Sequence, residues 1–356
     1  MQGNSRDYYN LIVRGNLGFS SAMSKVLRRT GKTSLLIRKS PLKTVSCQFN
    51  DAVICSNSTF IEVVDSGNRL RGIYSLLGVA GLFALIVFLC GFLYIITSGA
   101  GKIPLLLSGI VVFSLILGLL LLLPIINAFI RRDMFRQTHY PMRFNRRDRK
   151  VYAWSQDMGV VTMNWDDIQF YTSEATKSQD RRGMSREEIR GYVRDRNGNL
   201  LYHVVFFKYE GLKGMKGVLE IWELVRRYME EHDGHIQAYQ VDQRLLDLDG
   251  KRESFIHSLI QAKQVLADSR AVQLILAPAV MWAGTGRLIA KWTCRVPRWP
   301  EWVEEKCQVA PDDPYVRNRH TEAPLTAKEI LWPLFCYLLG WAEVLVILYF
   351  CFRGYL

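Results

Sequence analysis

The sequence lacks the cysteine patterns of a disulfide-stabilised secreted protein or of a zinc protein. Its seven cysteines, at positions 47, 55, 90, 294, 307, 336 and 351, form no Cys-x-x-Cys pair and are odd in number. Disulfide scaffolds use even, closely spaced sets, and zinc sites use paired ligands. Residues 1–30 contain no continuous apolar stretch, so we also expect no cleaved secretory signal peptide.

Catalytic and nucleotide-binding patterns are missing as well. No Gly-x-Ser-x-Gly or His-Glu-x-x-His motif occurs, and the TGKT segment at residues 30–33 has Val26 where a phosphate-binding loop requires its first glycine. Asp166 and Asp167 are adjacent and therefore point apart. The HDGH segment at residues 232–235 stands where a helix is expected to stop. We therefore expect no enzymatic activity, no metal and no cofactor.

Charge is absent from two long apolar segments, which run from Ile73 to Thr97 and from Ile103 to Ile130. Each exceeds the roughly 20 residues that a helix needs to cross a hydrocarbon core of about 30 Å. Only the SGAGK segment at 98–102 separates them, so we predict a transmembrane helical hairpin over residues 71–131. Arginines are more numerous on the outer flanks than at the tip, which predicts a cytoplasmic N-terminus and a cytoplasmic main domain.

A third apolar segment, from Ile330 to Phe352, is also long enough to cross a membrane. Glu343 is its only charge, and an acidic residue at mid-membrane costs about 2.5–3.5 kcal/mol on insertion scales. The surrounding apolar residues can offset this cost, so we favour a third span over a helix that lies along the interface. Glu343 is then the predicted intramembrane polar residue, either protonated or facing a bound partner.

The net charge is +13, and much of the basic charge lies just after the second apolar segment. A basic run next to an anionic leaflet gains about 1 kcal/mol per residue near the surface. No recognisable base-reading element accompanies this charge, so membrane lipids are the predicted partner and nucleic acid is not. The predicted lipid-contact residues are Arg131, Arg132, Arg136, Arg143, Arg146, Arg147, Arg149 and Lys150.

The remaining chain has an α+β pattern. The basic segment 1–70 contains short strand patterns at 45–47, 52–55 and 59–64, which could pair with strands that follow the hairpin. Residues 138–232 contain a run of further strand patterns, including an Asn-Gly hairpin signal at 197–198, and end in an amphipathic helix at 217–231. Residues 241–325 are predicted to be helical over 241–267 and irregular around 297–302.

Tryptophans and cations alternate late in this last region. Tryptophan among basic residues suits a membrane interface or a protein contact, and a packed core with exposed arginines fits the pattern equally well. The apolar stretch from Ala271 to Ala283 is too short to cross a membrane, which favours a buried or interfacial position. The alternating residues are Trp282, Lys291, Trp292, Arg295, Arg298, Trp299 and Trp302.

Short strands closed by one helix over residues 138–232 resemble a pleckstrin-homology-like domain. The segments YPMRFNRRDRKVY at 140–152, WDDI at 165–168 and RWP at 298–300 resemble a family of uncharacterised bacterial membrane proteins. Its members are often encoded near type VI secretion and polymorphic-toxin genes. The residue patterns together predict a multi-pass α+β membrane protein with a transmembrane helical hairpin, an antiparallel β cytoplasmic domain and a helical C-terminal region. The resemblance implies a non-enzymatic role in contact-dependent antagonism, at the bacterial inner membrane. It carries over no catalytic residue.

Two functions are therefore predicted. The first is a non-enzymatic immunity or accessory protein that binds a cognate toxin at the membrane, as the resemblance implies. The alternative is a lipid-responsive scaffold or regulator that uses the basic juxtamembrane residues. A membrane-active toxin is a third and weaker hypothesis, and the oligomeric state is left open.

Overall fold

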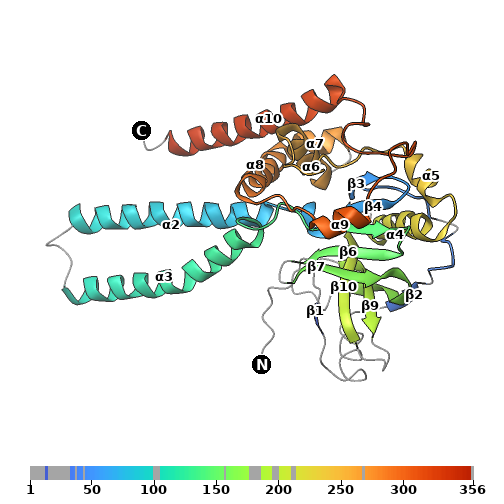
Figure 1. Ribbon diagram of the computed structural model, residues 1–356. Coiled ribbons are helices and arrows are strands. Elements are labelled where there is room, and N and C mark those ends of the chain that lie inside the picture. The colour runs from blue at the N-terminus through green and yellow to red at the C-terminus, as the bar shows by residue number, and fades with distance from the viewer. Residues whose placement is uncertain are drawn as a thin grey trace. The chain divides into compact units, whose positions relative to one another are not determined.

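The computed structural model describes residues 13–14, 33–36, 38–42, 45–98, 105–155, 158–175, 186–194, 200–209, 214–266 and 269–353. Segments that lie far apart in the sequence combine into two compact units (Figure 1). The first, here named the β-sheet unit, draws on residues 1–69, 137–257 and 296–330. The second, named the helical unit, draws on residues 70–136, 258–295 and 331–356. The predicted α+β class is therefore confirmed.

The first antiparallel sheet of the β-sheet unit brings together strands from both sides of the apolar hairpin. Its order is β3–β4–β5–β6–β7. Phe60 pairs with Asn145 and Val64 with Pro141, so β4 lies beside β5, and the predicted pairing across the hairpin is confirmed. Aromatic and β-branched residues fill these strands, as a buried pleated surface requires. The bounds are β3 Val53–Ser56, β4 Phe60–Val64, β5 Pro141–Asn145, β6 Lys150–Ser155 and β7 Gly159–Asn164.

The second antiparallel sheet has the order β1–β10–β9–β8–β2. Arg190 lies opposite both Tyr171 on β8 and Val205 on β10, so β9 is central. The Asn-Gly signal at 197–198 and most of the TGKT segment lie outside the described residues. The bounds are β1 Val13–Arg14, β2 Thr33–Leu36, β8 Ile168–Ala175, β9 Arg186–Arg194 and β10 Leu200–Tyr209.

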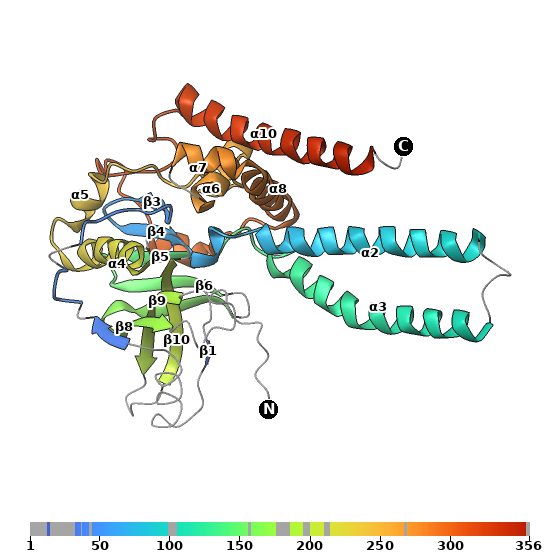
Figure 2. The same ribbon diagram turned by 180° about the vertical axis from the view of Figure 1, so that it is seen from behind.

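The predicted amphipathic helix at 217–231 is confirmed as α4 (Gly214–Glu230). It contacts β9, β10 and β5 within the β-sheet unit (Figure 2). Its Trp222 lies 4.6 Å from Phe170, which lies 5.0 Å from Trp165, measured between ring centroids. All three rings are buried. Such aromatic contacts stabilise the folded protein by about 0.5–1.5 kcal/mol each, in addition to the effect of the area they bury. This aromatic cluster therefore forms the centre of the core.

Two predicted elements of the β-sheet unit are wrong. Residues 45–47 form no strand, although they are described. Residues 241–254 form no helix, because this segment runs along β3 instead: the Leu246 amide donates to the Val53 carbonyl at 2.8 Å. Gly250 then turns the chain at a φ of +61°. Helix returns only at α6 (Phe255–Leu266), after the short α5 (Gly234–Tyr239).

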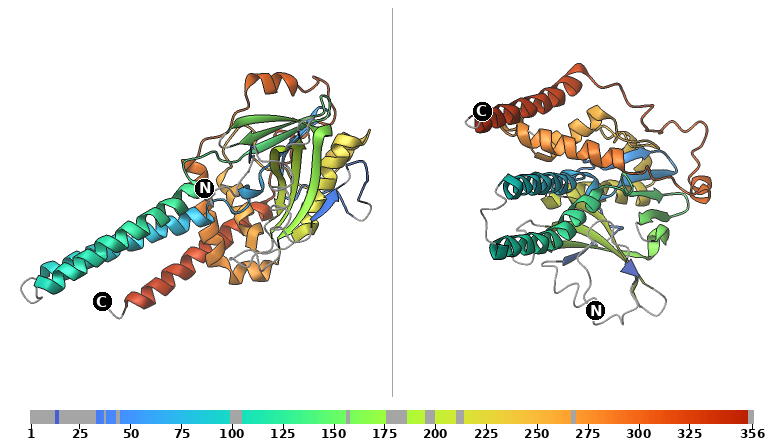
Figure 3. Two further views of the ribbon diagram at one scale, coloured as in Figure 1. Left: turned by 90° about the horizontal axis from the view of Figure 1, so that it is seen from below. Right: turned by 90° about the vertical axis from the view of Figure 1, so that its left-hand side faces the viewer.

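The predicted apolar hairpin is confirmed as two helices of the helical unit, α2 (Ile73–Ser98) and α3 (Leu105–Asp133). They run side by side (Figure 3). At their base the Ser75 hydroxyl donates to the Ile130 carbonyl at 3.1 Å, and a Cβ at Gly78 would lie 2.9 Å from Phe129 and Ile130. Small residues therefore permit this close approach. The connection at 99–104 lies outside the described residues.

The other helices of this unit are most of α6, α7 (Arg270–Ile275), α8 (Ala277–Thr293) and most of α10 (Ala327–Phe352). Gly340 of α10 packs directly on the Ala277 backbone of α8. The Thr285 and Tyr337 hydroxyls lie 3.1 Å apart, and Trp332 donates its indole N–H to Gln273 at 2.6 Å. These contacts join α7, α8 and α10.

Two helices in the described part of the chain are long and apolar enough to cross a membrane. The segments are Ile73–Gly91, with a mean hydropathy of 2.5, and Ala327–Cys351, with a mean hydropathy of 2.0. Large apolar side chains such as Phe83 on α2 and Phe350 on α10 are exposed. Length and composition thus support membrane association.

Candidate functional site

An open cavity of about 510 Å³ lies in the β-sheet unit. Its walls come from the β3–β4 hairpin, from β5, and from the short helix α9 (Glu301–Lys306) with the loops that follow. The volume falls within the range of ligand pockets. We name it the acidic cavity; it is lined by Cys55, Asn57, Phe60, Arg143, Asp249, Glu301, Glu304, Glu305, Cys307, Gln308, Val309, Val316, Arg317 and Asn318.

Arg143 forms one wall of the acidic cavity and is held from four sides. Its guanidinium donates to Glu62 at 2.6 Å and to Glu304 at 2.9 Å. It also lies between the rings of Phe60 and Trp299, 4.7 and 4.9 Å from their centroids. Its side chain is 8% exposed. Arg143 therefore fastens α9 and the segment before it to the first sheet.

The Arg143–Glu62 pair balances burial against charge. Burial raises the pKa of Glu62, and it does so against the lowering effects of the Arg143 charge and of the hydrogen bonds from Arg143 and Trp299. Burial would lower the pKa of Arg143, but Glu62 and Glu304 more than offset this, so its pKa is raised. Arg143 stays charged, and its charge and hydrogen bonds oppose the rise that burial causes in the pKa of Glu62.

The loop after α9 is also tied to the first sheet. Asn145 donates its side-chain amide to the Lys306 carbonyl at 2.8 Å. Ser58 donates its amide and its hydroxyl to one carboxylate oxygen of Asp313, at 2.8 and 2.7 Å. Ser56 and Arg317 form an isolated antiparallel bridge. The walls of the cavity are thus held by hydrogen bonds, and the site is largely pre-formed.

Negative charge predominates in the lining of the acidic cavity. Arg143 is neutralised by Glu62 and Glu304, and Arg317 by Glu322 at 2.6 Å. Within the described residues, no ion pair engages the other lining carboxylates, which are those of Asp249, Glu301 and Glu305. A chain of net charge +13 therefore carries a cavity with uncompensated negative charge, which suits a cationic ligand.

Two thiols reach the same cavity. Burial raises the pKa of the Cys55 thiol well above its usual value, and burial likewise raises the pKa of the Cys307 thiol. Both therefore stay protonated, and a protonated thiol is a poor nucleophile. Cys55 and Cys307 pack with Phe60, Tyr152 and Val303 as part of a small apolar cluster. Their place in the site is structural.

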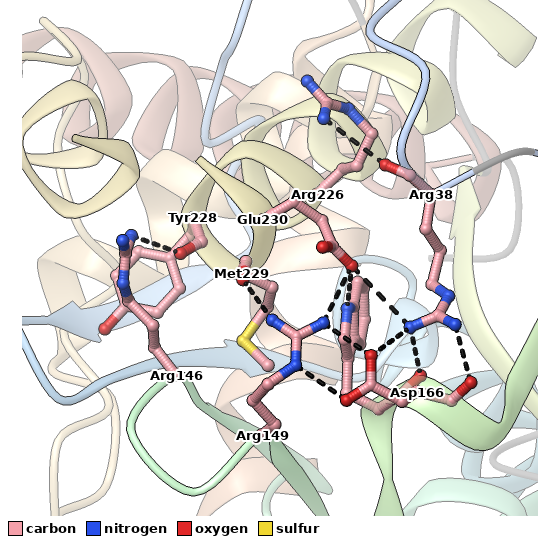
Figure 4. Close-up of polar contacts among 9 residues, drawn as sticks. Arg38, Arg146, Arg149, Asp166, Arg226, Tyr228, Met229 and Glu230 are labelled. Carbon is pink, nitrogen blue, oxygen red and sulfur yellow. Dashed lines mark hydrogen bonds and ion pairs between the residues drawn. The ribbon is translucent and has the colours of Figure 1, made fainter. Parts of the chain in front are cut away.

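The predicted lipid-contact arginines of the β5–β6 turn have partners inside the β-sheet unit (Figure 4). Arg146 donates to the carbonyls of Tyr228 and His232 at 2.8 and 2.7 Å. Arg149 donates to the Met229 carbonyl at 2.9 Å. Cations that bond the last carbonyls of a helix are stabilising. Both arginines therefore cap α4.

Asp166 joins Arg149 and Arg38 in the same cluster (Figure 4). Arg149 donates to both of its carboxylate oxygens, at 2.7 and 2.6 Å, and Arg38 donates at 3.0 Å. The indole N–H of Trp165 donates to Glu230 at 2.6 Å. Hydrogen bonds from Arg149 are the largest cause that lowers the pKa of Asp166 to about 2, with Arg38 adding to them.

We expect Asp166→Asn to lower stability slightly at neutral pH and not at all at pH 2. The pKa of Asp166 is lower in the folded protein than its unfolded value near 4, so the ion pair stabilises the folded protein above about pH 4. This stabilisation is lost as pH falls through about 2. The side chain is 53% exposed, so the loss should not exceed about 1 kcal/mol. Unfolding midpoints of the unmodified protein and of Asp166→Asn, measured from pH 7 to pH 2, would test this. The neighbouring Asp167→Asn is the control, and equal pH profiles for all three proteins would contradict it.

The other predicted lipid-contact residues fall into two groups. Arg131, Arg132 and Arg136 lie at the end of α3 or just beyond it, and Arg132 stacks 3.8 Å above the centre of the Tyr74 ring. In the β-sheet unit, the Arg147 side chain is 55% exposed and Lys150 is half-buried, whereas Arg143 is buried, unlike the predicted contact.

Other singled-out residues also have defined places. Glu343 lies half-buried on α10. The His235 ring packs edge-on against Tyr315, 5.0 Å between centroids, and Asp233 accepts from Gln237 at 3.0 Å. Over the described part of the chain, no group of three or more His, Cys, Asp or Glu residues could hold a metal ion.

Sequence reasoning missed the acidic cavity, although one signal pointed to it. Glu62 interrupts the apolar strand FIEVV, whose five residues are all buried. A carboxylate at such a position needs a cationic partner. The run Glu301, Glu304 and Glu305 was a weaker sign, because charged residues on a short helix usually face water.

Comparison with known proteins places the chain in a family. No curated protein and no solved structure matches it. A family model matches residues 119–311, which extend from within α3 through β5–β10 to the loop after α9 and make up more than half of the chain. The protein therefore belongs to DUF6708, a family of unknown function.

Proposed function

We propose that this protein is a non-enzymatic, membrane-attached binding protein whose acidic cavity receives basic side chains of a protein partner. The observation that carries this proposal is the unpaired negative charge of Asp249, Glu301 and Glu305 in a pre-formed cavity. Lysine and arginine side chains fit both the charge and the volume. Complementary charge favours rapid and specific association.

We further propose that the partner is a toxin and that the protein is an immunity or accessory protein of a bacterial secretion system. Support comes from the resemblance of the 140–152, 165–168 and 298–300 segments to proteins encoded near type VI secretion genes. In the structure these segments hold Arg143, Trp165 and Trp299, which build the core and the cavity wall. The resemblance thus rests on residues that organise the β-sheet unit.

The proposed setting is the bacterial inner membrane, with α2, α3 and α10 crossing it and the β-sheet unit in the cytoplasm. The arginines that flank the hairpin support this orientation. The β-sheet unit is proposed to be pleckstrin-homology-like. In its support, β4–β7 lie in one sheet, β8–β10 lie in the other, and α4 follows directly, so the hairpin is an insertion after the first of these strands.

The proposal is tested by measuring whether the protein protects cells from a toxin. Cells expressing the full chain are challenged by a competitor that carries the neighbouring secretion cluster, and by an isogenic competitor that lacks its toxin. We expect the competitor that carries the toxin to kill cells without the protein and to spare cells that express it. Both kinds of cell should survive the competitor that lacks the toxin. The double variant Glu301→Gln/Glu305→Gln should bind the toxin at least about tenfold more weakly, which corresponds to about 1.4 kcal/mol. Both side chains are exposed, so folding should be unaffected.

The matched control removes two exposed carboxylates outside the cavity lining, Asp242→Asn/Asp312→Asn. It should protect as well as the unmodified protein. Unchanged survival against every neighbouring toxin would contradict the immunity role. Protection that persists in the cavity variant would instead place the toxin contact elsewhere.

The alternative function, a lipid-responsive scaffold, is supported by fewer of the predicted basic side chains. Arg143, Arg146 and Arg149 already bind groups of the β-sheet unit. Arg131 and Arg147 are the exposed arginines of the predicted set. The observed contacts therefore favour the partner-binding function.

A further inference from the structure

Helix α8 buries its two basic side chains and exposes a tryptophan. Arg287 and Lys291 are 1% and 2% exposed, although both are basic. Trp292 is 76% exposed, although tryptophan is the largest side chain. Leu288 and Ile289 are each partly exposed between them. The C-terminal half of α8 thus turns its apolar side outward.

This arrangement is the reverse of what water selects. A helix on the surface of a water-soluble protein buries its apolar stripe and exposes its charges. Lysine and arginine are almost never fully buried unless they are paired, and Arg287 and Lys291 do have partners within the protein. The outward face of α8 therefore matches surroundings that are less polar than water.

The position of α8 within the helical unit identifies those surroundings. Gly286 packs against the backbone of Gly72, one residue before α2 begins. Beyond the helix, the Cys294 thiol donates to the Asp133 carbonyl at 2.9 Å, and the Arg295 amide donates to the Arg136 carbonyl at 2.8 Å. The C-terminal end of α8 therefore lies at the base of the apolar hairpin.

The other end of α8 continues the same surface. Ile275, the last residue of α7, is 78% exposed, and Val272 is 39% exposed. At this end Ala277 packs on Gly340 of the apolar helix α10. Exposed apolar residues therefore lie near both ends of α8, one end beside the hairpin base and the other beside α10. In the described part of the chain, α2 and α10 carry the segments that are apolar enough to enter a bilayer.

We infer that α7 and α8 lie in the head-group interface of the bilayer that α2 and α10 enter, with Trp292 and Ile275 inserted among the lipids. Tryptophan is enriched at this depth because its ring is apolar while its N–H can still bond to water or head groups. The buried Arg287 and Lys291 then face the protein. This inference rests on the proposed membrane attachment.

The test measures depth in the full chain reconstituted into phosphatidylcholine vesicles. The exposed or half-buried thiols Cys47, Cys90 and Cys351 are first replaced by serine. Single cysteines are introduced as Trp292→Cys or Ile275→Cys and labelled with the fluorophore NBD. Ile86→Cys on α2 serves as the deep reference, and Asp312→Cys in the β-sheet unit as the aqueous one. Quenching is compared for lipids that carry a nitroxide near the head group or deep in the acyl chain.

We expect labels at 292 and 275 to be quenched more strongly by the shallow nitroxide, and the label at 86 by the deep one. The label at 312 should be quenched by neither. A label at 292 and a label at 275 that are both unquenched, while 86 is quenched, would overturn the inference and leave membrane attachment intact. An unquenched label at 86 would instead overturn membrane attachment itself. Both tested side chains are more than three-quarters exposed, so their replacement removes little packing.

Discussion

Replacing Arg143 with methionine is expected to destabilise the β-sheet unit by about 3–5 kcal/mol. The change leaves Glu62 as a buried carboxylate without its cation, and breaking one side of a buried ion pair costs about this much. It also removes the charge that holds Glu304 at 2.9 Å. Urea unfolding of the full chain in detergent, followed by tryptophan fluorescence, would measure the loss.

The pH dependence of that loss identifies its cause. Burial already raises the pKa of Glu62 in the intact pair. Without Arg143 the pKa of Glu62 should rise further, so the variant is stable when Glu62 is protonated and loses stability as pH increases through the raised value. The deficit should therefore be smaller at pH 5 than at pH 8. A deficit that does not change with pH would contradict the buried-charge explanation.

Two controls accompany Arg143→Met. Arg147→Met changes an exposed arginine in the turn after the same strand and should shift stability by no more than about 0.5 kcal/mol. The double variant Arg143→Met/Glu62→Met removes both charges and should recover most of the loss, because an apolar pair can replace a buried ion pair. A double variant as unstable as Arg143→Met would show that packing against Trp299 and Phe60 matters more than charge.

Gly72→Ala is expected to cost the helical unit about 3 kcal/mol or more. Gly72 has a φ of +93°, which side chains rarely adopt, and an added Cβ would collide with the Gly286 backbone. Backbone strain and overpacking each cost about 1–3 kcal/mol. The junction between α2 and α8 should open, seen as a lower thermal midpoint and faster proteolysis of the full chain in detergent.

Gly91→Ala, within α2, is the control. An added Cβ there would meet no atom within 4 Å, so the variant should behave like the unmodified protein. Equal losses in both variants would mean that glycine is needed for helix flexibility in general. A stable Gly72→Ala would mean that α2 and α8 do not meet at these residues.

Much of the secondary structure follows from local pattern. The β3 and β4 strands lie where the β-branched residues of the 52–55 and 59–64 patterns predict them. The helices α2, α3 and α10 follow from the absence of charge over long segments. The failed helix at 241–254 shows the limit: Leu246 of this segment bonds to Val53 of β3, a contact that the local sequence does not specify.

The acidic cavity could not be predicted in the same way. Arg143 meets partners that lie 81 and 161 residues away along the chain. A basic residue in a basic segment is expected to be exposed, because the local sequence does not identify the distant carboxylates that neutralise its charge. The burial of the tryptophans could not be predicted for the same reason. Trp299 stacks on Arg143, whereas Trp292 is exposed.

By itself the sequence determined the apolar helices and most of the strands, because the length of an uncharged segment and the alternation of side chains act locally. Only the tertiary structure decided which charges are buried. Arg143, Arg287 and Lys291 lie inside because distant segments surround them, and the free energy of burying a charge depends on those partners. The same contacts leave Glu301 and Glu305 on an open cavity and turn Trp292 outward.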